Sequence, residues 1–193
     1  MNVASVLTRR VSILLAALAL PLCLSADVPD GWHLAGSAPN DFETGVYNLL
    51  NRGSAAFLRS RVDEPAGFGT LMQTFSATDY RGKRLRLSGA LKTNDVKIWA
   101  GLWMRIDGPA DERLGFDNMS NRRITGSTDW NSHEIVLDVP EQSVAIAFGV
   151  LLMGFGEVLI DDIRFDEVGQ DIAVTGDKIP GLPPEPANLK FDE

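Results

Sequence analysis

The sequence has little of what catalysis and covalent cross-linking need. Its 193 residues include one Cys, two His and two Tyr. A single cysteine cannot form a disulfide within the chain. The pair His133-Glu134 lacks the second histidine of a zinc-protease helix, and no Gly-x-Ser-x-Gly nucleophile motif occurs. Paired carboxylates that could cleave glycosides cannot be singled out among 26 acidic residues. We therefore expect a protein that is not an enzyme.

Positive charge is also scarce. The chain has 18 Lys and Arg against 26 Asp and Glu, a net charge of −8. Nucleic-acid binding relies on clustered basic residues that neutralise phosphates, and no helix-turn-helix pattern is visible. The sequence therefore predicts no nucleic-acid partner. The apolar content of 45% is ordinary for a globular domain and argues against disorder throughout.

The segment 1–26 differs from the rest because it contains no acidic residue. Two arginines precede the apolar run 11–20, and small residues close the segment, a pattern typical of a signal peptide. The run is short for a transmembrane span, which needs about 20 residues. We expect cleavage after Ser25 or Ala26, contact with the membrane only through this segment, and a periplasmic or extracellular location; an uncleaved anchor is the alternative. Cleavage would leave 16 basic and 26 acidic residues, a net charge of −10, and no cysteine.

The body, residues 27–168, follows the two-residue period of β-strands. Leu85 and Leu87 fall on one face of such a run with polar residues between them, while 144–153 is apolar on both parities and suits a strand covered on both faces. About nine strands are expected, from the candidate segments 31–34, 45–50, 55–60, 69–75, 85–92, 98–106, 113–116, 135–139, 144–153 and 158–165. This pattern predicts an all-β jelly-roll β-sandwich, with a barrel as the alternative. The Pro-rich, acidic stretch 169–193 is expected to be a solvated tail.

The run 98–107 contains the candidate ligand-binding residues. Alternation assigns its aliphatic side chains to the core and places the other set on the opposite face: Trp99, Trp103, Arg105 and Asp107. Aromatic rings beside polar groups suit stacking on sugar rings or other flat apolar surfaces, with hydrogen bonds that fix orientation. The alternative is that both tryptophans pack beneath a loop or a second layer, since large aromatic residues are usually buried.

An ordered set of segments carries a family resemblance. The segments are Tyr80-Arg81-Gly82-Lys83-Arg84-Leu85-Arg86-Leu87-Ser88-Gly89, Leu91-Lys92-Thr93, Gly126-Ser127-Thr128-Asp129-Trp130 with the strand that follows to Val139-Pro140, and Gly154-Phe155-Gly156-Glu157-Val158-Leu159-Ile160-Asp161-Asp162-Ile163. In this order they resemble the galactose-binding-like jelly-roll modules, especially the carbohydrate-binding modules of secreted glycan-degrading enzymes. The resemblance covers most of residues 31–166. It implies a noncatalytic module that binds a carbohydrate or related small ligand. The alternative is a structural or assembly protein of the bacterial envelope that binds a protein partner.

The same resemblance implies a structural calcium ion. An Asp of the last strand, here Asp161 or Asp162, would share it with an acidic residue near the first strand, Asp41 or Glu43. Calcium needs several oxygen ligands, so these carboxylates alone do not suffice. The alternative is that Asp161 and Asp162 pair with Arg105 or another basic residue.

Overall fold

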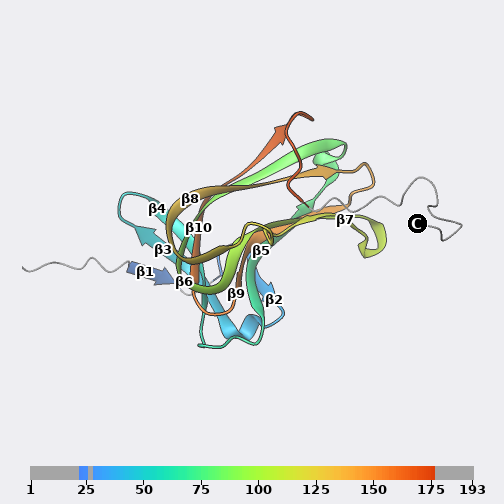
Figure 1. The fold of residues 1–193 in the computed structure, drawn as a ribbon. Coiled ribbons are helices and arrows are strands. Elements are labelled where there is room, and N and C mark those ends of the chain that lie inside the picture. Colours follow the sequence, from blue (N-terminus) through green and yellow to red (C-terminus); the bar gives the residue numbers. More distant parts are fainter. Residues whose placement is uncertain (1–21, 26–27, 177–193) are drawn as a thin grey trace, which may run out of the picture.

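A computed structural model of the protein describes residues 22–25 and 28–176, which form an antiparallel jelly-roll sandwich (Figure 1). The strands of this part are β1 (Leu22–Ser25), β2 (His33–Gly36), β3 (Phe42–Leu49), β4 (Gly53–Ser60), β5 (Phe68–Ser76), β6 (Lys83–Asp107), β7 (Arg113–Asp117), β8 (Ile124–Val139), β9 (Ala145–Met153) and β10 (Glu157–Val168). The helices described are three short 3₁₀ turns: η1 (Pro39–Asp41), η2 (Thr78–Tyr80) and η3 (Pro109–Asp111). None of the described helices is long and apolar enough to cross a membrane. The expected all-β class is confirmed.

The two layers share β6. Its first part pairs with β10 and β8, so the first layer runs β1-β3-β4-β10-β6-β8. Its second part pairs with β9 and β7, so the second layer runs β7-β6-β9-β5-β2. The separate strands expected at 85–92 and 98–106 are therefore wrong, because one strand of 25 residues covers both. Asp95, with φ of 52°, lies where the register with β8 shifts, and such irregularities let one strand bend from one layer into the other.

The core lies between the layers. Leu85 and Leu87 of the first layer are fully buried in the same cluster as Met104 and Val150 of the second. Phe148 and Phe165 join the layers, with ring centroids 4.8 Å apart. The predicted alternation therefore holds in β6. Strand β9 is buried along most of its length, as its two apolar parities predicted.

Strand β1 overlaps the predicted signal peptide. It lies at the edge of the first layer, where Leu22 pairs with Asn48 and Cys23 with Tyr47 of β3. The predicted positively charged and apolar parts of the signal peptide fall in residues 1–21, outside the described residues. Export and cleavage stay predictions. Cleavage after Ser25 or Ala26 would remove β1 and leave β3 at the edge of the layer.

The beginning of the expected tail is bound to the sandwich. Thr175 donates its backbone N–H to the carbonyl of Val136, 2.9 Å away, and its hydroxyl accepts the N–H of Val136 at 2.8 Å. Arg84 Nη1 donates to the carbonyls of Gln170 and Ile172. These bonds hold residues 169–176 beside β8, and the rest of the Pro-rich stretch lies outside the described residues.

Candidate functional site

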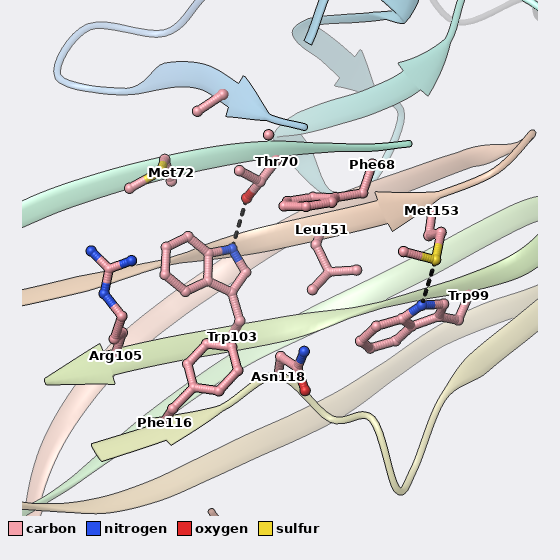
Figure 2. Close-up of a pocket in the computed structure, with 12 residues that line it drawn as sticks. Phe68, Thr70, Met72, Trp99, Trp103, Arg105, Phe116, Asn118, Leu151 and Met153 are labelled. Atoms are coloured by element: carbon pink, nitrogen blue, oxygen red, sulfur yellow. Dashed lines mark hydrogen bonds between the residues drawn. The ribbon is translucent and has the colours of Figure 1, made fainter. Parts of the chain in front are cut away.

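A pocket of about 410 Å³ opens on the face of the second layer that is turned away from the core (Figure 2). All five strands of this layer, β2, β5, β6, β7 and β9, contribute to its walls. Its lining residues are Ala35, Gly36, Phe68, Thr70, Met72, Trp99, Trp103, Arg105, Phe116, Asn118, Leu151 and Met153. Three of the four residues predicted to bind ligand are among them.

The alternation of β6 brings the two tryptophans to this face. Trp99 and Trp103 point away from the core side chains of the same strand and pack with Ala147 and Leu151 of β9 in a separate small cluster. They are only 6% and 7% exposed. The structure agrees in part with both interpretations of these residues. The rings are largely buried, as the packing alternative expected, and they also line a pocket.

The polar atoms of these two indoles are already engaged. Trp103 Nε1 donates to Thr70 Oγ1 at 2.7 Å, and the Thr70 hydroxyl in turn donates to the carbonyl of Val150 at 2.9 Å. Trp99 Nε1 donates to the sulfur of Met153 at 3.3 Å. The Arg123 guanidinium lies 5.3 Å from the centroid of the Trp99 ring. Only the small exposed part of the ring carbons therefore remains open in the pocket.

Arg105 supplies the charged group of the pocket. In Figure 2 it lies at one end, beside Trp103, and Trp99 lies at the other. Its Nε and Nη2 donate to the two carboxylate oxygens of Asp107 at 2.7 and 3.0 Å. Asp107 is not among the residues that line the pocket, and its carboxylate holds Arg105. Its contact with a ligand stays a prediction. Arg105 Nη1 makes no hydrogen bond to the part of the chain that the structure describes.

Asn118 also lines the pocket with a side chain that has free polar capacity, and sequence patterning did not predict it. Its Oδ1 accepts the backbone N–H of Ser120 at 3.2 Å, which leaves the amide nitrogen to donate. Other lining residues also escaped prediction: Phe68, Met72, Phe116, Leu151 and Met153. They lie on three other strands, and only the strand pairing brings them beside β6. For Leu151 and Met153 there was a signal, because 144–153 is apolar on both parities.

The acidic residues expected to share a calcium ion bind different partners instead. Arg52 Nε donates to Asp161 at 2.7 Å and Arg52 Nη2 donates to Asp162 at 3.2 Å. The ion-pair alternative therefore describes these two residues, with Arg52 as the base where Arg105 was named. The described residues contain no group of three or more His, Cys, Asp or Glu that could hold a metal ion.

Asp41 and Glu43 do not join that pair. Glu43 receives hydrogen bonds from the Nε and Nη2 of Arg59, and an oxygen of Asp41 accepts the backbone N–H of Ala66 at 2.9 Å. A carboxylate paired with a guanidinium has its charge balanced without a metal. The structure therefore supplies no assembled oxygen cage from the four predicted carboxylates, and calcium binding stays a prediction.

No protein-family model matches the chain. A relative of Bacillus subtilis (strain 168), named as the uncharacterized HTH-type transcriptional regulator YbfP, is 49% identical over 167 residues. The match covers 84% of this chain and 57% of that protein. The chain thus spans little more than half the length of this curated relative.

Solved structures with a similar architecture belong to varied proteins. The xylan-binding domain CBM22-1 of Paenibacillus barcinonensis Xyn10C gives a TM-score of 0.51 at 15% identity, over 73% of this chain and 88% of that one. A Stig cyclase from Fischerella sp. TAU gives 0.54 at 14% identity, over 75% and 88% of the two chains. Tailspike protein 4 of bacteriophage CBA120 gives 0.58 at 12% identity, over 74% and 20%. At these identities the likeness shows the fold, and carbohydrate-binding modules are among the proteins that share it.

Proposed function

We propose that this chain is a noncatalytic binding protein whose pocket holds a neutral carbohydrate or a related small ligand. The observation that carries the proposal is the meeting of Trp99, Trp103 and Arg105 in one concave site. Ligand sites of this kind are mostly apolar, with a few polar groups that fix orientation. The pocket has that composition.

The state of Arg105 favours a neutral ligand. Its charge is balanced by Asp107 through two hydrogen bonds, so an anionic ligand would have to compete with a carboxylate already in place. The unengaged Nη1 can still donate to a hydroxyl or carbonyl oxygen. A ligand with one flat apolar face and such an oxygen at its edge would contact both the indole carbons and Arg105.

The lining supports a role in binding rather than catalysis. No carboxylate, imidazole or thiol is among the described residues that line the pocket. General acid–base and nucleophilic catalysis both need such a group within hydrogen-bond reach of the substrate. Turnover of a glycan or ester by the pure protein would contradict this part of the proposal.

Isothermal titration calorimetry of the full chain against a panel of neutral glycans and small aromatic ligands tests the proposal. Arg105→Met removes the free donor and Ala35→Phe takes up pocket volume, and each should weaken binding about tenfold or more. The matched control is Arg86→Met, because Arg86 also pairs with an aspartate, Asp166, but lies away from the pocket.

Two results would overturn the proposal. One is the absence of binding across the whole panel. The other is a ligand whose affinity is unchanged by Arg105→Met and by Ala35→Phe. A stoichiometric protein partner recovered by pull-down, and unaffected by Arg105→Met, would favour the envelope-protein alternative instead.

A second candidate follows from the Bacillus relative, whose name states a transcriptional regulator with a helix-turn-helix. A helix-turn-helix reads DNA with α-helices, and the described residues of this chain include none. In this candidate the sandwich is the ligand-binding part of such a regulator. Cell fractionation with N-terminal sequencing separates the two: export predicts a cleaved chain outside the cytoplasm, whereas a regulator predicts a chain retained inside.

A further inference from the structure

A second concave surface lies on the outer face of the first layer. It is a groove of about 970 Å³, more than twice the volume of the pocket above. Strands β3, β6, β8 and β10 line it together with the turn that joins β3 to β4. Tyr47, Leu159 and Trp130 form its apolar floor. They pack with the buried Phe57 in a small cluster that is separate from the main core.

The charges that line this groove are balanced by close partners. Arg52 is held by Asp161 and Asp162 through its Nε and Nη2. Lys92 Nζ donates to Asp129 at 3.0 Å, a hydrogen bond that lowers the pKa of that carboxyl and keeps the pair ionised.

A fourth charge, on Glu157, is balanced in the same way. Its carboxylate accepts the Tyr47 hydroxyl at 2.9 Å and lies 3.6 Å from Arg59 Nη1. A fully ionic ligand would therefore meet little uncompensated charge in the groove. A neutral ligand could bind without breaking the existing ion pairs.

Side-chain amides lie beside these pairs. Three exposed asparagines line the groove, Asn48, Asn51 and Asn94, and a side-chain amide can both donate and accept. Asn48 Oδ1 already accepts the Ser54 hydroxyl at 2.9 Å, which leaves its amide nitrogen to donate. Polyhydroxylated ligands match such a surface, because every hydroxyl is also both donor and acceptor.

Arg52 and Trp130 lie against each other on this surface. The Arg52 guanidinium lies 3.9 Å from the centroid of the Trp130 ring, a contact that Arg105 does not make with a described ring of the first pocket. Within the described residues, Arg52 Nη1 and Trp130 Nε1 make no hydrogen bond. In both places an arginine fixed by aspartate through Nε and Nη2 keeps Nη1 for another acceptor.

Leu50 adds an apolar contact at the rim. Its side chain is 83% exposed, the highest value among the large hydrophobic residues described, and it lines the groove next to Asn51. The carbon face of a sugar ring placed in the groove would bury part of this exposed surface.

We propose that this groove is a second binding site, for a neutral oligosaccharide of several sugar units. Its volume accepts more than one ring, its amides match sugar hydroxyls, and its paired charges favour an uncharged chain. Arg52 and Trp130 contact the ligand through the free Nη1 and the indole N–H, because the guanidinium already covers the ring. The site is distinct from the pocket of Trp99 and Trp103, which lies on the other layer.

Titration of the ¹⁵N-labelled full chain, followed by NMR through the indole N–H signals, tests the proposal. The four tryptophans give four signals. Trp130→Phe, Trp103→Phe and Trp99→Phe assign three of them, and the fourth belongs to Trp32. The probes are neutral hexasaccharides of β-1,4-linked xylose, glucose and galactose. At least one of them should shift the Trp130 signal, and the shift should persist in Arg105→Met.

The variants Asn94→Ala and Leu50→Asp should each weaken the affinity obtained from that titration about tenfold, while Arg86→Met should leave the affinity unchanged. Both altered side chains are exposed, so neither change threatens folding. The proposal is overturned if no hexasaccharide moves the Trp130 signal, if Arg105→Met abolishes the shift, or if only an anionic oligogalacturonate binds, with salt-sensitive affinity. A shift at Trp130 without one at Trp99 or Trp103 would retain this groove and count against the first pocket.

Discussion

Thr70 shows how one hydroxyl can organise a pocket wall. It accepts the indole N–H of Trp103 and donates to Val150, so the ring is fixed and its polar atom is satisfied. Thr70 is 4% exposed and Trp103 7%. The orientation of the pocket wall therefore depends on a buried side chain.

Replacement of Thr70 by Val should destabilise the protein by about 1–3 kcal/mol, because a buried indole N–H loses its acceptor. Urea denaturation measures the free energy of unfolding. Thr74→Val is the matched control, since Thr74 is an exposed residue of the same strand and should change stability by less than about 0.5 kcal/mol. Equal stability of the Thr70 and Thr74 variants would show that the hydrogen bond contributes nothing measurable.

Asp117 is a buried carboxylate with several donors. Its side chain is 5% exposed, and it accepts hydrogen bonds from Arg122, from the backbone of Met119 and from the hydroxyl of Thr175. The network therefore connects β7, the loop after it and the segment that follows β10. Such a carboxylate is costly to leave without its cation.

Arg122→Met should lower the free energy of unfolding by about 2–3 kcal/mol, somewhat less than for a fully buried pair, because the Arg122 side chain is 32% exposed. Thermal and urea unfolding give the value. Arg164→Met serves as control: its ion pair with Asp162 is 3.8 Å long and its side chain is 70% exposed, so little change is expected. A loss no larger than that of the control would contradict the role assigned to Arg122.

Sequence parity located part of the site and could not complete it. The two-residue period placed Trp99, Trp103 and Arg105 on one face because it depends only on the chain itself. It could not tell that Asp107 turns to Arg105, since that is a choice of rotamer. It also could not supply Phe68 or Phe116, whose nearness depends on which strands pair.

Strand β6 was predicted from the sequence as two separate strands. Asn94 and Asp95 carry turn propensity, so the run was expected to end there, yet the strand continues through a bend with a positive φ at Asp95. Gly156 faces the bend: a Cβ there would lie 2.7 Å from the Cα of Val96, and its φ is +135°. The atoms that a Cβ at this position would meet belong to the backbone of β6, which cannot move aside as a flexible side chain can.

Gly156→Ala should therefore destabilise the fold by more than the roughly 1 kcal/mol expected for strained φ alone, and lower the yield of folded protein. Gly126→Ala is the control, because Gly126 also has positive φ, +70°, but has no atom within 4 Å of a Cβ. Circular dichroism during thermal unfolding compares the two. Equal losses of Tm would mean that contact with β6 does not matter.

At the scale of the whole molecule, the sandwich presents a concave surface on each outer face. The pocket of the second layer is mainly apolar, and the groove of the first layer is larger and richer in amides and ion pairs. Both depend on β6, which contributes residues to each layer. The general fold was predictable from strand patterning, whereas the two surfaces were not, because they depend on register and side-chain pairing across the sheets.

Stability should also depend on pH through His133. Burial, with a smaller effect of the nearby positive charge of Arg122, lowers the pKa of His133 below its ordinary value of 6.5. Above that value both folded and unfolded chains hold a neutral imidazole and stability is complete. As pH falls below it, the unfolded chain binds the proton first, so the free energy of unfolding decreases until the folded pKa is passed.

Urea midpoints measured from about pH 7.5 to about pH 5 should therefore fall, and His133→Gln should make the fall shallower. His33→Gln controls for the loss of an exposed imidazole elsewhere. An unchanged slope in His133→Gln would show that other groups govern the acid sensitivity.

Ligand binding at the pocket of Trp99 and Trp103 is tested most directly by NMR titration of the full chain with the neutral glycan and small-ligand panel, observed at the indole N–H signals. A bound ligand is expected to shift the Trp99 and Trp103 signals. It should leave unchanged the signal of Trp32, which packs against the core with its ring centroid 5.4 Å from that of Phe148. Arg105→Met should weaken the affinity about tenfold. A panel in which no ligand moves the Trp99 or Trp103 signal would contradict the assignment of this pocket as the binding site.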